Sequence, residues 1–188
     1  MRRHRGRILM LACVLTLAAA PALAGTHPPD RKGFMIGFGL GGGSAALQDG
    51  GDREGGVTGN LRIGYALRPD LVLHYEGAAW TRTFNQPIGD VTWSFSTNAA
   101  ALTYYPPATG LFVRGGIGFG TARIQLKTGG VTVSDDETGF GFLMAAGWEF
   151  RLTQKFALAP QMEYAYQTLD ILESSNFFDF GLGFNWYW

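Results

Sequence analysis

The chain is poor in the residues that perform covalent or metal-dependent chemistry. It has one cysteine, Cys13, and three histidines, at positions 4, 27 and 74. A single cysteine excludes an intrachain disulfide and a multi-thiolate metal site. A triplet of acids at 135–137 matches no defined calcium-ligand spacing. We therefore expect neither a metal site nor a cofactor.

Long apolar runs are absent except at the start of the chain. Four arginines within residues 1–7 precede the apolar stretch 8–20, and Ala22-Leu23-Ala24 offers small residues for cleavage. This is the pattern of a secretory signal peptide over residues 1–24, which would leave a periplasmic tail at 25–32. Lipidation at Cys13 is disfavoured because Met10-Leu11-Ala12 is a poor lipobox. The rest of the chain has no apolar run of helix-spanning length, which excludes a transmembrane helix but not a transmembrane barrel.

An excess of positive charge is also missing. Without residues 1–24 the chain has 11 Lys and Arg against 15 Asp and Glu, a net charge of −4. A basic surface is the usual sign of nucleic-acid binding. We therefore expect no nucleic-acid partner.

What the chain does have is apolar side chains at every second position, the period of a β-strand with one apolar face. Short connections at 68–70, 106–110 and 153–155 alternate with longer polar ones at 44–56, 83–90, 125–138 and 169–176. This layout predicts an all-β fold: an eight-stranded antiparallel up-and-down transmembrane β-barrel over residues 33–188, with both termini in the periplasm. The expected strands lie near 34–40, 57–67, 71–76, 91–105, 111–123, 140–150, 156–167 and 178–188. A second interpretation of 125–138 is that it continues its two strands beyond the membrane.

The apolar faces are too bulky to point inward. A barrel of eight strands has an interior just wide enough for side chains to fill it, and most strands carry several Phe, Trp, Leu, Ile or Tyr on one face. We therefore expect these faces to contact lipid, with Trp93 and Phe95 in an aromatic girdle near the outer loops. The opposite faces carry small and polar residues together with a few large side chains expected to point inward, namely Trp80, Tyr104, Phe112 and Tyr187.

Glycines dominate the opposite faces. Gly37-x-Gly39-x-x-Gly42 has the spacing of a dinucleotide-binding loop, but no helix pattern follows it, and a phosphate site needs the amide groups of a helix N-terminus. GxG also recurs later in the chain with the same period. We therefore expect the glycines to line the lumen and make room for larger inward side chains; they are Gly37, Gly39, Gly41, Gly116, Gly118, Gly120, Gly181 and Gly183.

The C-terminal segment FDFGLGFNWYW, together with the leader and the eight alternating segments, resembles the small outer-membrane barrels of the OmpA/OmpX type. The resemblance implies localisation in the bacterial outer membrane, contact with its lipids and lipopolysaccharide, and recognition by the barrel-assembly machinery. The residues that match the family's C-terminal assembly signal are Phe180, Leu182, Phe184, Trp186 and Trp188.

Charged residues on the small-residue faces predict a polar network inside the barrel. The turn at 68–70 sets Arg62 across from Glu76, and Arg114 and Glu149 lie at similar heights on the next pair of strands. Glu163 and Asp179 lie higher up. We interpret this network as a structural plug that leaves the lumen largely occluded. The alternative is a gated polar pore.

Members of this superfamily include anchors, adhesion factors, narrow channels and lipid A-modifying enzymes. A lipid A hydrolase needs a histidine base beside a serine in the outer half, and none of the three histidines is placed there. We therefore expect a non-enzymatic barrel that serves envelope structure, or surface interaction through loops 44–56 and 125–138. The alternatives are a narrow channel for small or amphipathic solutes and, less favoured, a lipid A-modifying enzyme.

Overall fold

The computed structural model describes residues 31–47, 52–87, 89–107, 109–129, 131–169 and 174–188. Its elements are all strands: β1 (Gly33–Leu47), β2 (Glu54–Arg68), β3 (Leu71–Gln86), β4 (Gly89–Tyr104), β5 (Leu111–Thr128), β6 (Val131–Trp148), β7 (Phe150–Arg151), β8 (Phe156–Thr168) and β9 (Ser174–Tyr187). The expected signal peptide and residues 25–30 of the tail lie outside the described residues. Within the described ranges, no helix has the length and apolar character needed to cross a membrane.

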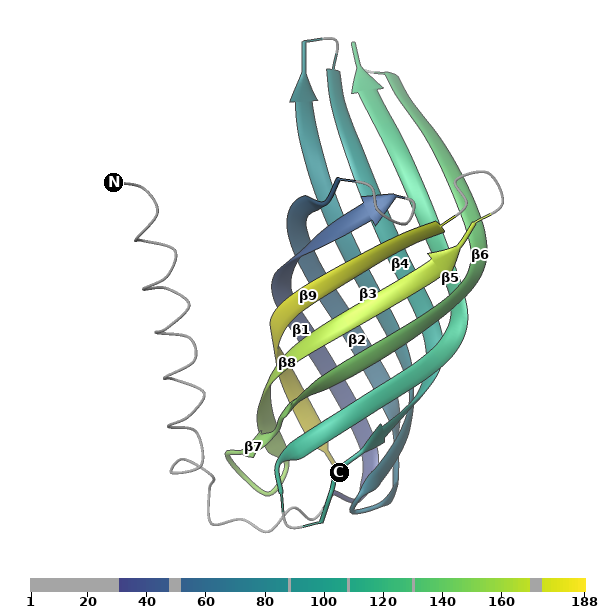
Figure 1. The fold of residues 1–188 in the computed structure, drawn as a ribbon. Coiled ribbons are helices and arrows are strands. Elements are labelled where there is room, and N and C mark those ends of the chain that lie inside the picture. The colour runs from purple at the N-terminus through teal and green to yellow at the C-terminus, as the bar shows by residue number, and fades with distance from the viewer. Residues whose placement is uncertain (1–30, 48–51, 88, 108, 130, 170–173) are drawn as a thin grey trace.

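The strands form one closed antiparallel barrel (Figure 1). Except for β6 and β7, strands that are neighbours in the sequence pair with each other; β1 pairs with β9, and β6 pairs with β8 to complete the ring. The two-residue strand β7 also pairs with β8 and is separated from β6 only by Glu149. β6 and β7 are therefore one wall strand with a break, and the expected eight-stranded up-and-down barrel is confirmed.

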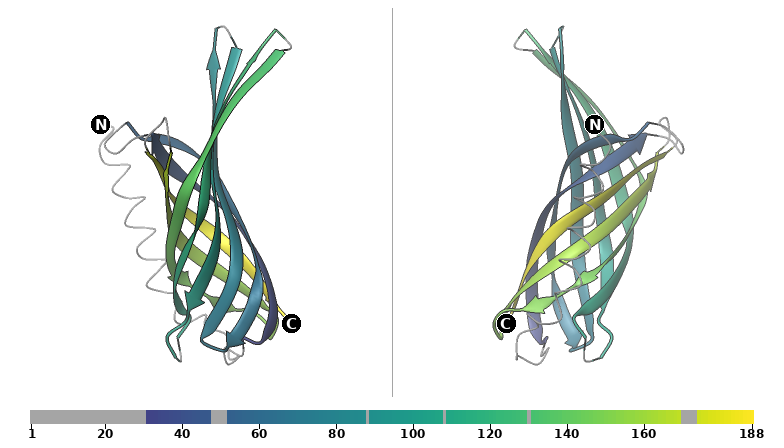
Figure 2. Two further views of the ribbon diagram at one scale, coloured as in Figure 1. Left: turned by 90° about the vertical axis from the view of Figure 1, so that its right-hand side faces the viewer. Right: turned by 60° about the vertical axis from the view of Figure 1, so that its left-hand side comes forward.

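The two ends of the barrel differ. The terminal end carries Gly33, Trp188 and the short connections 69–70, 105–110 and 152–155, which match the predicted short turns. At the opposite end, called here the hairpin end, β3–β4 and β5–β6 rise well beyond the other strands (Figures 1 and 2).

Two of the expected polar loops are strands. β3 and β4 remain paired to Gln86↔Gly89, and β5 and β6 to Thr128↔Val131. The prediction of loops at 83–90 and 125–138 was therefore wrong, and the second interpretation of 125–138, continued strands, is confirmed. Part of the expected loop 44–56 is also strand, because β1 runs to Leu47 and β2 begins at Glu54. The polar composition of these segments led to the prediction of loops. Paired strands that extend beyond a membrane can be polar, because they have no lipid-facing side.

The bulky faces point outward around the wall, as expected. The large side chains with high exposure include Phe38, Leu61, Ile117, Phe140 and Phe180. Replacing water by hydrocarbon around such a band removes the cost of exposing it. The alternation therefore assigned the lipid-facing side correctly along most of the wall.

Three aromatic assignments were wrong. Tyr104 is 41% exposed and points outward, whereas Tyr105 is 4% exposed and lies inside. β4 ends at Tyr104, so Tyr105 is released from the alternation and turns under the barrel. Phe95 is buried in the interior, and Trp93 packs against the same interior cluster rather than forming a girdle.

Candidate functional site

The inward glycines set the width of the lumen. A Cβ atom built on Gly118 would lie 2.0 Å from the backbone oxygen of Asn98, and one on Gly183 would lie 2.8 Å from Nη2 of Arg62. A Cβ on Gly120 would lie 2.0 Å from Oε1 of Gln167. Gly37 and Gly39 lie in β1 with no helix after them, so a phosphate loop is excluded here. Gly118 has no room for a side chain because the obstacles are backbone atoms, and Gly120 has none because Cβ of Gln167 would lie 2.4 Å away. At Gly183 the obstacle is the end of the Arg62 side chain.

A layer of ionic side chains fills the middle of the lumen. Nε of Arg114 lies 2.8 Å from Oε2 of Glu76, and its Nη2 lies 2.6 Å from Oε2 of Glu163. All three side chains are almost completely buried. Arg114 comes from β5, Glu76 from β3 and Glu163 from β8, so one guanidinium ties together three separate parts of the wall.

Arg62 lies beside this layer. It is opposite Glu76 in the β2–β3 register, as predicted, although a bulge between Ala66 and Arg68 shifts the pairing near the turn. Its Nη1 donates to Oε1 of Gln161 at 3.4 Å. The carboxylate of Glu76, however, forms its ion pair with Arg114. Arg62 and Glu76 are therefore opposite in the register without being the ion pair. Asp179 is buried and stands opposite Glu163 in the β8–β9 register.

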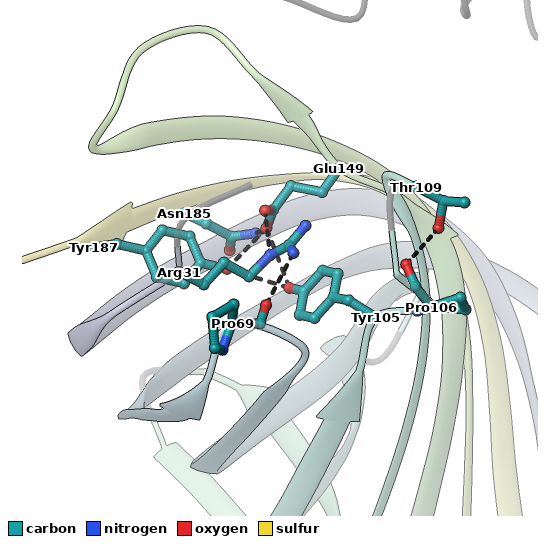
Figure 3. Close-up of polar contacts among 8 residues, drawn as sticks. All are labelled: Arg31, Pro69, Tyr105, Pro106, Thr109, Glu149, Asn185 and Tyr187. Carbon is teal, nitrogen blue, oxygen red and sulfur yellow. Dashed lines mark hydrogen bonds and ion pairs between the residues drawn. The ribbon is translucent and has the colours of Figure 1, made fainter. Parts of the chain in front are cut away.

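The predicted pair of Arg114 with Glu149 was wrong. Glu149 lies in the break between β6 and β7 at the terminal end, where Nε of Arg31 donates to its Oε1 at 2.9 Å (Figure 3). Oε2 of Glu149 accepts hydrogen bonds from the Tyr105 hydroxyl at 3.1 Å, the Tyr187 hydroxyl at 2.8 Å and Nδ2 of Asn185 at 2.9 Å. These five residues are called here the Arg31 cluster.

The Arg31 side chain fills the terminal end of the lumen. Its guanidinium carbon lies 3.4 Å from the centre of the Tyr105 ring, a cation–π contact, and its Nη1 donates to the backbone oxygen of Pro69 at 3.2 Å. Burial is the largest single influence and would lower the pKa of Arg31, but the Glu149 carboxylate together with Tyr105 and Tyr187 outweighs it and holds that pKa above its usual value. Burial and the same carboxylate raise the pKa of Tyr105 to about 12, so its hydroxyl remains a donor at physiological pH.

Sequence reasoning placed Arg31 in a periplasmic tail and missed its role. The available signal was its position two residues before β1, where a long cationic side chain can fold back into the nearest opening. Only the closed barrel shows that the break at Glu149 lies beside that opening, because these positions are 118 residues apart in the chain.

We expect Arg31→Ala to lower the free energy of unfolding by about 1.5–3 kcal/mol, the range for hydrogen bonds to charged groups. The loss stays moderate because Glu149 keeps three other donors. Urea titration of the refolded protein in detergent micelles measures the change. The control is Arg68→Ala, whose pair with Asp70 is exposed and should contribute under about 1 kcal/mol. Equal effects of the two substitutions would contradict the account.

An apolar layer fills the lumen toward the hairpin end. Trp80 and Phe95 stack with ring centres 5.4 Å apart, and Leu143, Leu169 and Phe177 complete the cluster. The lumen is therefore not polar throughout, contrary to the expectation. The period-two pattern marks which side faces inward, but it does not restrict that side to polar groups.

The lumen also contains His74, one of the three histidines considered above for a catalytic base. It is 3% exposed, and its Nε2 lies 2.8 Å from the Thr103 hydroxyl. No cluster of histidine, cysteine or acidic residues suited to a metal ion occurs among the residues described.

Comparisons with known proteins agree with this geometry. The family profile described as "Outer membrane protein beta-barrel domain" matches residues 10–187. Ail, the attachment invasion locus protein of Yersinia pestis, solved in complex with the heparin analogue sucrose octasulfate, is 17% identical with a TM-score of 0.60; the match covers 82% of this chain and 99% of Ail. Neisserial surface protein A is 15% identical with a TM-score of 0.63, covering 82% of this chain and 97% of that protein. A comparison with curated proteins found no match.

Proposed function

Because the chain belongs to the outer membrane protein β-barrel domain family, we propose that it is a surface-interaction protein anchored in the outer membrane by a barrel with a sealed lumen. The termini lie in the periplasm and the hairpin end lies outside the cell. The barrel is the anchor, and the extended hairpins β3–β4 and β5–β6 are the contact region.

The filling of the lumen is the observation that carries the proposal. The Arg31 cluster, the ionic layer around Arg114 and the apolar layer around Trp80 follow one another along the barrel. Ions passing through would have to displace a buried guanidinium from two carboxylates and then cross a layer of packed rings. Breaking buried ion pairs costs free energy, so steady conduction is disfavoured. With the lumen closed, the function is assigned to the extended hairpins.

Ail is an attachment protein whose structure holds a sulfated sugar. Attachment suits this chain better than binding of a polyanion. Arg82 lies 3.1 Å from Glu54, and Arg123 lies 3.7 Å from Asp136, so two cations of the extended hairpins already have carboxylate partners. We therefore propose a partner that is not a sulfated polysaccharide.

Conductance in planar lipid bilayers tests the sealed lumen. We expect no steady channels from the wild type, from Glu76→Gln or from Arg31→Ala, because two filled layers remain after either change. Heat-modifiability on gels first establishes that each sample is folded. Steady channels whose conductance changes in Glu76→Gln would establish the narrow-channel alternative instead.

Adherence of cells that display the protein tests the role of the hairpins. Deleting residues 123–126 together with 133–136 shortens β5 and β6 equally and preserves which side chains face inward. We expect adherence to surfaces and to other cells to fall to the level of non-expressing cells, with surface display unchanged. Undiminished adherence by this variant would refute the surface role.

We further propose that the C-terminal strand is read by the barrel-assembly machinery and that the outward faces contact outer-membrane lipid and lipopolysaccharide. Phe180, Leu182 and Trp188 are 60%, 40% and 55% exposed on the outer wall. Phe184 and Trp186 stack on Phe38 with ring centres 4.9 and 5.5 Å away, so the strand is anchored to β1 at barrel closure.

A further inference from the structure

The extended hairpins reverse the polarity of the barrel wall. Nearer the terminal end, an outward-facing row across β3 to β6 consists of Tyr75, Ala100, Ile117 and Phe142, and the inward positions are small or polar. Beyond Phe119 and Phe140 the outward side becomes polar. Successive outward rows there are Ala79, Ser96, Thr121 and Thr138; Thr81, Ser94, Arg123 and Asp136; and Thr83, Thr92, Gln125 and Ser134.

The inward side becomes apolar over the same stretch. The register is continuous along all three pairings, so strand alternation assigns the faces. One inward row is Phe84, Val91, Leu126 and Val133, and the next is Arg82, Trp93, Ile124 and Asp135. This surface is called here the inner face of the protruding sheet, which consists of residues 81–86, 89–94, 123–128 and 131–136.

Polar groups of the outer face are hydrogen-bonded to one another. Hydroxyl pairs join its strands: Thr81 with Ser94 at 3.0 Å, and Thr83 with Thr92 at 2.9 Å. Such a surface is suited to water. A sheet exposed to water on both sides is stable with two polar faces. An apolar second face is expected where the sheet covers a partner.

The inner face is only partly covered by its own side chains. Phe84 packs edge-on against Trp93 with ring centres 5.2 Å apart, while Val131 and Val133 are 60% and 61% exposed. It continues into the buried layer of Trp80 and Phe95, so it has a rigid base. Exposed apolar patches with polar rims mark interaction sites.

We propose that the inner face docks an extended polypeptide segment with a row of apolar side chains and a basic residue beside Asp135. This rests on the surface-interaction function proposed above and names the partner class. The charges favour a polypeptide over a hydrocarbon, because the apolar centre is flanked by Arg82 on β3 and by Asp135 on β6. The β6–β8 pairing ends at Gly141↔Gln167, so within the described chain β6 at 131–136 has no strand partner on that side. Its edge is therefore open, and a segment can enter over it to reach the inner face.

A second copy of this chain is a poor occupant. The protruding sheet rises from the β3–β6 part of the wall, above one side of the barrel (Figure 2), and by the continuous register its inner face is the continuation of the lumen side. Two barrels embedded side by side in one membrane would hold these faces apart, each over its own barrel.

Panning a random peptide library displayed on phage against the full-length protein in lipid nanodiscs tests the proposal. We expect enrichment of peptides that combine several apolar residues with Lys or Arg. Affinities of the selected synthetic peptides are then measured against two matched pairs of variants. Val133→Asn should weaken binding about tenfold or more, as for a central contact, and Thr132→Asn, its neighbour on the outer face, should not.

The second pair tests the charge. Asp135→Asn should weaken binding several-fold and remove the preference for basic residues, whereas Asp136→Asn on the opposite face should leave both unchanged. All four positions are exposed, so folding is expected to be retained. No enriched peptides, or equal binding to both members of each pair, would overturn the docking face. Enrichment of purely apolar peptides that a fatty acid displaces would show a hydrocarbon site instead. Either result, obtained while the hairpin deletion still abolishes adherence, leaves the surface role standing.

Discussion

Gly118→Leu should yield no folded barrel in detergent micelles. The first atom of the new side chain would lie 2.0 Å from the Asn98 backbone oxygen and 2.8 Å from the Ala99 Cα. Overpacking a core typically costs about 1–3 kcal/mol, and the cost here exceeds that range because the obstacles are backbone atoms of a paired strand. Loss of the heat-modifiable gel band is the measurement.

Gly115 on the same strand provides the control. It faces outward, and a Cβ at this position would meet nothing within 4 Å. Gly115→Leu should therefore fold in normal yield and add apolar surface on the lipid side. If both variants fold in normal yield, the packed lumen described above is wrong. If neither folds, the defect reflects the loss of glycine itself rather than the lack of space.

Arg114→Leu should lower the free energy of unfolding by about 3–5 kcal/mol, the cost of leaving a buried charge without its partner. Two carboxylates lose their cation at once, since both Glu76 and Glu163 contact Arg114. Urea titration of refolded protein in lipid vesicles, followed by gel mobility, reports the shift in midpoint.

Two further variants separate the charge from the packing. Arg123→Leu removes an arginine from the same strand whose pair with Asp136 is half-exposed, and should change stability by less than about 1 kcal/mol. Adding Glu76→Gln and Glu163→Gln to Arg114→Leu should recover much of the loss, because no uncompensated charge remains. A triple variant that is no more stable than Arg114→Leu would show that packing, and not charge, accounts for the effect.

The charged residues illustrate how far sequence reasoning reached. The inward placement of Arg62, Glu76, Arg114, Glu163 and Asp179 follows from parity along each strand, and the structure buries all five. Their partners do not follow from parity. Arg114 contacts strands that are not its neighbours, because a closed barrel brings opposite walls within the reach of one side chain.

The hairpin end illustrates a different limit. The polar stretches 83–90 and 125–138 carry strong turn and loop signals, yet most of both is paired strand. A strand outside the membrane is exposed to water on its outer face, so its composition resembles that of a loop. The apolar positions 131 and 133 were the available sign of continued alternation.

By itself the sequence determined the number of strands, their order, the short turns and the side of the wall that faces hydrocarbon, because these depend on neighbours along the chain and on a period of two. The tertiary structure alone decided what fills the barrel. Arg31 meets Glu149, Arg114 meets Glu163, and Trp80 stacks on Phe95 only once the wall curves and closes. Those contacts join residues distant in sequence, and their geometry is set by the curvature of the ring.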